Sequence, residues 1–420
     1  MRRICYLLLA FTLAFTACDD DNDGYVLQRA DITVVAPEGG YVAEVGKVFR
    51  LKVNSVSDEG VTYQWLQGNT VISQSKNLEY TFKTAGQYTL KLRVAQGSVS
   101  YDYNVVVNVK GKDEPLEHQS PYITKVLEYL PAVGQFTNEL PKYVKGDTQE
   151  DMNRKALDAI GHNNLGIISL GGFGGYVIVG FDHTIRNVAG KRDFRVLGNA
   201  FDAAADASAG SSEPGVIMVS YDENKNGKAD DAWYEIAGSA HRDASQEPWI
   251  AKAQAAGNDV NLYRNYEITY HRPEVEPKEG DYAEYIRWED NQGNQGFKAK
   301  NAYHNQPYYP LWVKEDQLTF KGTCLPQNGI DESGEGTCFV CFRFGFGYAD
   351  NDLNTSDGST IDIDWAMTSD GRKVHLPGID FIKIYSGVNQ ENGWIGECST
   401  EVTGVEDLHI LGESIDSPAL

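Results

Sequence analysis

The chain has 420 residues and a formal net charge of −23 at pH 7, with 60 acidic against 37 basic side chains. This negative charge argues against a nucleic-acid-binding protein and against direct docking on anionic lipid, because both partners repel it. It is compatible with cation binding. Tyrosine and glycine are abundant and helical periodicity is scarce, so the sequence predicts a mostly β protein.

The N-terminus has the pattern of a bacterial lipoprotein signal. Arg2 and Arg3 precede an apolar run over residues 4–15, which is too short to span a bilayer as a mature helix. Small residues then lead to Cys18. We therefore expect residues 1–17 to be removed and the thiol of Cys18 to be acylated, with palmitate among the acyl chains. Such a lipid holds a protein stably at a membrane.

Residues 18–30 form a predicted acidic tether. Its aspartate run resembles the export signal of Bacteroidetes surface lipoproteins, which implies an outer-membrane protein that faces the cell exterior. Two simpler interpretations stay open. The first is an ordinary secretory signal cleaved near Ala17, and the second is a flexible, solvated tether with no export role.

Residues 31–110 show short alternating strands separated by turn residues, which predict a β-sandwich. The segments 63–65, 80–82 and 85–90 resemble the PKD-like family of immunoglobulin-type domains. This resemblance implies that Trp65 is the buried core aromatic residue and that Gly86 lies in the turn before a strand. No catalytic group is evident in this domain.

Residues 111–121 have the composition of a linker. Residues 122–412 then predict a larger, jelly-roll-like β-sandwich for ligand binding, with long loops and one or two short helices, and 413–420 form a tail. A helix is predicted over 148–159, because Asp147 or Thr148 provides a cap and an apolar stripe follows. The predicted strands cover 175–181, 193–197, 215–221, 233–237, 266–270, 339–346 and 381–385.

One loop of the large domain has the calcium-loop pattern. Oxygen-bearing side chains occupy positions 1, 3 and 5, Gly227 permits the sharp turn at position 6, and position 7 offers a backbone carbonyl. Trp233 stands where the usual bidentate glutamate would be. The alternative is a polar Asn-Gly hairpin. The predicted ligands of a structural Ca²⁺ are Asp222, Asn224, Asn226, Lys228, Asp230 and Asp231.

A second acidic stretch spans residues 348–364. Asp362 and Asp364 are expected to share one strand face and to meet Asp350 or Asp352. Carboxylates this close need a cation, a hydrogen-bond network or a raised pKa. We predict a second metal site here, and a carboxylate pair for glycoside hydrolysis is the other interpretation.

Residues 301–312 mix aromatic rings with amides and prolines. Flat rings stack on sugars or macrocycles while amides bond to their edges, so this stretch predicts a ligand face. The alternative is a loop whose rings cover the edge of the sandwich. The predicted ligand-binding residues are Tyr303, His304, Tyr308, Tyr309 and Trp312, and Trp249, Trp288 and Trp394 lie in other polar loops.

Four cysteines remain in the predicted mature domains: Cys324, Cys338, Cys341 and Cys398. Disulfides are permitted in an export compartment, and four cysteines allow three pairings. Free thiols are an equally good interpretation. Cys338 and Cys341 are poor partners for each other, because residues three apart on a strand face opposite sides.

Three segments together, 180–201, 213–239 and 378–390, resemble the PKD-like-domain cell-surface lipoproteins of Bacteroidetes. Relatives of this kind lie beside TonB-dependent transporters, so the resemblance implies capture of cobalamin or another corrinoid for uptake. A calcium-stabilised glycan-binding or adhesion protein is the alternative. A carboxylate-dependent glycoside-active enzyme is a third hypothesis. No catalytic constellation emerges, and we predict a protein that is not an enzyme.

Overall fold

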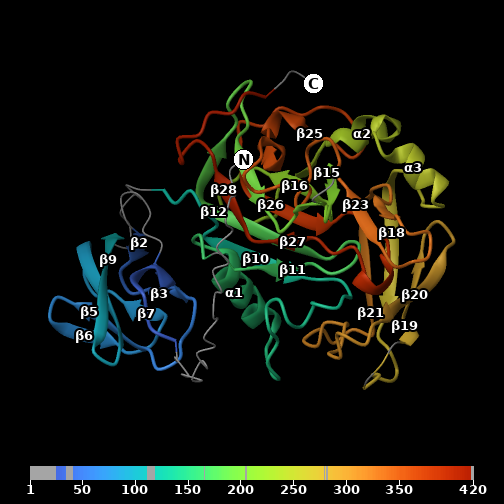
Figure 1. The fold of residues 1–420 in the computed structure, drawn as a ribbon. Coiled ribbons are helices and arrows are strands. Elements are labelled where there is room, and N and C mark those ends of the chain that lie inside the picture. The colour runs from blue at the N-terminus through green and yellow to red at the C-terminus, as the bar shows by residue number, and fades with distance from the viewer. Residues whose placement is uncertain are drawn as a thin grey trace, which may run out of the picture.

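The computed structural model describes residues 25–34, 41–110, 119–164, 166–203, 206–278, 280 and 282–417. The protein is mostly β and consists of a small N-terminal domain beside a larger one (Figure 1). The predicted signal 1–17, the predicted acylation site Cys18, most of the tether and linker residues 111–118 lie outside the described residues.

The N-terminal domain has a five-stranded sheet in the order β2-β9-β8-β5-β6, with the pair β3-β7 and the short pair β1-β4 beside it. Trp65 is fully buried, and its indole N–H donates to the carbonyl of Lys76 at 3.1 Å. Gly86 begins β8 with a φ of +144°, a value that favours glycine. The strands are β1 (Ile32–Thr33), β2 (Tyr41–Glu44), β3 (Val48–Leu51), β4 (Asn54–Ser55), β5 (Thr62–Gln67), β6 (Thr70–Ser73), β7 (Leu78–Thr81), β8 (Gly86–Gln96) and β9 (Val99–Lys110).

The large domain is organised around a six-stranded antiparallel sheet in the order β10-β12-β26-β16-β17-β25. Its strands are β10 (Lys125–Leu130), β12 (Tyr176–Arg186), β16 (Gly215–Ser220), β17 (Trp233–Ile236), β25 (Ala366–Met367) and β26 (Gly378–Ser386).

Smaller sheets surround this central one. They have the orders β20-β19-β18-β21, β14-β15-β23-β22, β24-β13-β28 and β11-β27. Their strands are β11 (Ile168–Ser169), β13 (Phe194–Leu197), β14 (Asp202–Ala203), β15 (Asp206–Gly210), β18 (Tyr263–His271), β19 (Tyr282–Asp290), β20 (Gln295–Lys300), β21 (Gln317–Cys324), β22 (Gly329–Asp331), β23 (Phe339–Phe342), β24 (Thr360–Ile361), β27 (Glu401–Val402) and β28 (Gly404–Asp407).

The predicted helix is helix α1 (Gln149–Ile160). The Thr148 hydroxyl accepts the N–H of Asp151, and the Asp151 carboxylate accepts the N–H of Thr148, so the two residues form a capping box. Met152, Ala156 and Ile160 are buried against the central sheet. Two shorter helices follow β17: α2 (Ser239–Asp243) and α3 (Ile250–Ala255).

All four cysteines of the large domain are free. Cys338 is exposed, whereas Cys324, Cys341 and Cys398 are buried. Burial raises the pKa of Cys324 to about 12. The three buried thiols are therefore small core groups, and none of the four cysteines forms a crosslink.

A buried histidine joins β12 to β28. The side chain of His183 is 2% exposed, and its two ring nitrogens lie 2.8 Å from carboxylate oxygens of Asp182 and Asp407. Burial opposes the charged ring, but hydrogen bonds and the charges of the two aspartates outweigh it and raise the pKa of His183 to about 9. The histidine is thus a buried cation held between two carboxylates.

This arrangement makes stability depend on pH. Because the folded pKa is about 9, against an ordinary value of 6.5, the stabilisation is complete below about pH 6.5 and is lost as pH rises through 9. We expect the difference in unfolding free energy between the wild type and His183→Gln to shrink by about 2 kcal/mol between pH 6 and pH 10. Urea unfolding at both pH values measures this difference.

The matched control is His375→Gln, because His375 pairs with Asp364 but its side chain is 75% exposed. Its effect on stability should change by less than about 0.5 kcal/mol over the same range. A gap between wild type and His183→Gln that stays constant with pH would contradict the buried cation.

Candidate functional site

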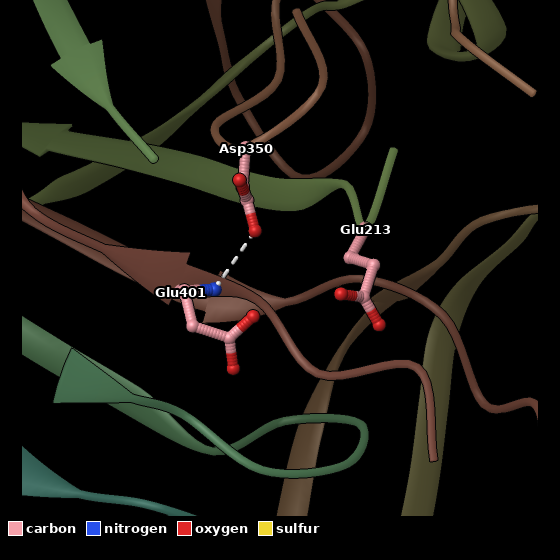
Figure 2. A group of neighbouring side chains, drawn as sticks. All are labelled: Glu213, Asp350 and Glu401. Carbon is pink, nitrogen blue, oxygen red and sulfur yellow. Dashed lines mark hydrogen bonds between the residues drawn. The ribbon is translucent and has the colours of Figure 1, made fainter. Parts of the chain in front are cut away.

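Three carboxylates meet in the large domain, those of Asp350 and Glu401 buried and that of Glu213 half-buried. Glu213 precedes β16, Asp350 lies in the loop after β23, and Glu401 begins β27. One carboxylate oxygen from each lies within 4.8 Å of the others. Figure 2 shows the three side chains converging from separate segments. Among the described residues this is the one such cluster of carboxylate, imidazole or thiol groups.

Backbone N–H groups hold the cluster in place. One oxygen of Asp350 accepts the N–H groups of Asn199 and Ala200 at 2.7 and 2.9 Å, and its other oxygen accepts that of Glu401 at 2.9 Å. Asp350 has a φ of +50°, a left-handed conformation that few residues other than glycine adopt. The hydrogen bonds offset that local cost and fix the side chain.

Ser399 binds the other two members. Its N–H donates to Glu213 at 3.1 Å, and its hydroxyl donates to Glu401 at 2.9 Å. Burial, with neighbouring carboxylates, raises the pKa of Glu401 to about 8 and the pKa of Glu213 well above its usual range. Burial also raises the pKa of Asp350, to about 7, although backbone N–H groups oppose this.

Three carboxylates this close are stable only when protons or a cation neutralise them. Their all-oxygen donor set is the kind that Ca²⁺ prefers. The sequence predicts Asp350 as a metal ligand but misses Glu213 and Glu401. Both lie more than fifty residues from Asp350 and stand in no recognisable motif.

The rest of the second acidic stretch does not join Asp350. Asp352 pairs with Arg343 at 2.9 Å. The prediction that Asp362 and Asp364 share one strand face is wrong, because Asp362 caps a 3-10 helix over Ile363–Trp365 and accepts the N–H of Asp364. The four aspartates therefore form several local structures rather than one site.

The calcium-like loop between β16 and β17 is held by hydrogen bonds among its own polar groups, with Asp222 buried and Asn224, Asn226 and Asp230 exposed. The carboxylate of Asp222 accepts the N–H groups of Asn226 and Gly227 at 3.0 and 2.7 Å. Asn226 accepts the N–H of Lys228 and donates to Asp230, and Asn224 donates to Asp231. These bonds are local pairs within the loop, and calcium binding there stays a prediction.

Most of the predicted aromatic face is buried. Tyr308 and Tyr309 are 2% exposed and Trp312 is 8% exposed, and all three pack in the hydrophobic core. Their rings offer no open face to a ligand, so the prediction that these three residues bind a ligand is wrong. His304 packs edge-on against Phe136, and burial lowers its pKa.

Tyr303 remains, with 78% of its surface exposed, and Trp394 is 58% exposed. Their loops meet at buried Gln135, whose side chain accepts from Asn301 at 2.9 Å and donates to the carbonyl of Ile395 at 2.7 Å. Two exposed aromatic residues therefore lie on loops that a single buried amide fastens together.

Residues 30–96 match the family model of the PKD-like domain. No curated protein matches the chain. In the part of the chain that the structure describes, no helix is long and apolar enough to cross a membrane.

Three solved structures show weak similarity. A quinoprotein alcohol dehydrogenase-like protein from Bacteroides thetaiotaomicron is 13% identical, with coverage of 49% of this chain and 46% of that one and a TM-score of 0.17. A structure of carbohydrate-binding modules from the β-sandwich superfamily is 10% identical, with coverage of 90% and 96% and a TM-score of 0.16. A SusE-like protein is 9% identical, with coverage of 90% and 97% and a TM-score of 0.15. Scores this low carry no argument about fold or function.

Chelation tests the calcium prediction for the Asp222 loop. A cation bound only by the folded state raises stability, so EDTA should lower the melting temperature of the wild type by several degrees. Asp222→Ala should remove this dependence, because Asp222 is position 1 of the loop. The control is Asp370→Ala, on another exposed turn, which should respond to EDTA like the wild type. An unchanged wild-type melting temperature would refute the calcium site.

The carboxylate cluster predicts a second dependence of stability on pH. It arises from carboxyl groups that bind a proton, whereas the first arises from the charged ring of His183. Carboxyl groups with raised folded pKa values bind more protons in the folded state, so the unfolding free energy falls as pH rises from about 5 to about 8. Glu213→Gln removes one negative charge. In the presence of EDTA, we expect it to reduce this fall by about 1–2 kcal/mol between pH 5 and pH 9 in urea unfolding.

The control is Glu335→Gln, an exposed glutamate in the loop before β23. It should leave the pH dependence as in the wild type. Equal falls in the wild type and Glu213→Gln would show that the three carboxylates do not titrate as one cluster.

Proposed function

We propose that this protein is a lipid-anchored binding protein of the outer-membrane surface that captures a glycan and catalyses no reaction. The observation that carries the proposal is the pair of exposed rings, Tyr303 and Trp394, on loops held together by Gln135. The anchor is Cys18, and the acidic tether holds the domains away from the lipid.

Exposed rings suit carbohydrate because a sugar presents C–H groups on one face and hydroxyl groups around its edge. The C–H face packs on an aromatic ring, and neighbouring polar groups bond to the hydroxyls. Trp394 is also fixed at its indole N–H, which donates to the carbonyl of Thr337 at 3.1 Å. A ring held before binding loses little conformational entropy when the ligand arrives.

The surroundings of the two loops favour binding over catalysis. Glu397 is buried, and its carboxylate accepts the N–H of Gln135 at 2.8 Å. His304 packs against Phe136. This acid and this imidazole therefore have structural partners, and neither is poised for proton transfer to a ligand.

The partner in this proposal is a TonB-dependent transporter that receives the captured ligand. Cobalamin or another corrinoid is the other candidate ligand, because exposed rings also stack on macrocycles. A lipid tether suits the capture of either ligand class. Direct binding measurements are therefore needed to distinguish a glycan from a corrinoid.

The test is calorimetric titration of the purified full-length protein with a panel of neutral oligosaccharides and with cyanocobalamin. We expect an oligosaccharide to bind, and Tyr303→Ala and Trp394→Ala each to weaken it about tenfold or more, ~1.4 kcal/mol. Tyr282→Ala is the matched control, since Tyr282 is 42% exposed on β19.

Binding of the corrinoid alone would overturn the ligand class. Binding of a glycan with unchanged affinity in both variants would overturn the assignment of the rings.

A further inference from the structure

A cavity of about 750 Å³ lies between the two domains. One wall consists of β2, β3 and the start of β7, and the other includes α1 and residues 119–124. Figure 1 shows the β3-β7 pair of the N-terminal domain on the side that faces α1. The domains also touch directly, since the side-chain amide of Asn54 donates to the carbonyl of Asn164 at 2.9 Å. The volume is within the range of pockets that enclose small molecules, about 300–1,000 Å³.

Basic side chains outnumber acidic ones along this cavity, in a chain whose formal net charge is −23. The acidic residues of the lining are Glu79, Asp158 and Asp182. The basic residues are Lys47, Arg50, Lys52, Lys142, Arg154 and Lys155. Four of these basic groups, those of Arg50, Lys142, Arg154 and Lys155, are each paired with a carboxylate.

Lys52 is the key member of this group. It is half-buried, and among the described residues no carboxylate lies within 4.0 Å of its ammonium group. Burial lowers its pKa, and Asp158 across the cavity offsets this only in part. A half-buried ammonium group without an ion pair is stabilised by an anion placed beside it.

Two guanidinium groups face the same space from opposite domains. Arg50 donates to Glu79 at 2.9 Å, and Arg154 donates to Asp151 at 2.8 Å. Each guanidinium has five N–H donors in a planar fork, so each retains donors for a second oxyanion after these bonds. Arg50 and Lys52 come from β3 and the residue after it, while Arg154 comes from α1.

We propose that this interdomain cavity binds a small ligand bearing a carboxylate, sulfate or phosphate group, with Lys52, Arg50 and Arg154 around the anion. The site is separate from the rings of Tyr303 and Trp394, so it stands or falls independently of the proposed glycan capture there. Because both domains supply side chains that contact the anion, a bound anion would also hold the N-terminal domain against α1.

The test titrates the full-length protein with four probes: a galacturonic acid trisaccharide, glucose 6-sulfate, inorganic phosphate, and the neutral galactose trisaccharide as reference. We expect at least one acidic probe to bind, the neutral reference not to bind in this cavity, and the affinity to fall as salt rises. The three acidic arms show which oxyanion the site prefers.

Lys52→Met and Arg154→Met should each weaken the acidic probe about tenfold or more. The control Lys321→Met removes a 73% exposed ammonium group from a different sheet and should leave the affinity unchanged. Trp394→Ala should also leave it unchanged, which separates this site from the exposed rings. Melting curves of all variants establish that they are folded.

Two results would overturn the inference. One is the absence of binding by every acidic probe at millimolar concentration. The other is binding that neither Lys52→Met nor Arg154→Met weakens, because the anion would then lie elsewhere.

Discussion

The buried carboxylates of the large domain impose the strictest electrostatic condition on this fold. Asp350, Glu397 and Glu401 are buried and Glu213 is half-buried, and burial raises the pKa of Glu397 to about 8. An isolated buried charge would be strongly destabilising, so each group needs a proton, a cation or hydrogen-bond donors. The donors come from distant segments, such as the N–H groups of Asn199 and Ala200 on Asp350. Satisfying these acids therefore draws several loops to one place.

The need to hydrogen-bond buried carboxylates also affects the loops that carry the exposed rings of Tyr303 and Trp394. Glu397 accepts the N–H of Gln135, and the Gln135 side chain then bonds the loop of Asn301 and the carbonyl of Ile395. The interior acid thus holds the backbone of the residue whose side-chain amide joins the two aromatic loops. Hydrogen bonds of this kind are stronger where water is excluded, so they favour one arrangement of the two loops. The hydrogen bond that the buried Glu397 accepts therefore helps to position the two loops at the surface.

Local features of this protein were predictable from sequence, and long-range ones were not. Thr148 and the apolar stripe behind it predict α1 to within one residue at each end, because caps and periodicity act over one or two turns. Trp65 follows from a family motif. Glu213 and Glu401 carry no local signal, since only the tertiary fold brings them to Asp350.

Only part of the prediction for the aromatic stretch 301–312 was correct, because burial of a ring depends on the tertiary fold. Its composition indicates ring stacking but cannot say which rings the core absorbs, and burial left Tyr303 alone of the predicted rings well exposed.

The N-terminal domain is best understood as more than a spacer. Along β3, Phe49 and Leu51 point into its core while Val48 and Arg50 point outward, and Lys52 follows in the same alternation. A domain that only separated the large domain from the membrane would need no cationic row facing α1. Asp158 lies on the opposite wall of the cavity, and within the row Arg50 is paired with Glu79 whereas Lys52 has no ion pair among the described residues. The ammonium group of Lys52 is therefore available to an anion. In our proposal, the junction between the domains is itself a binding surface.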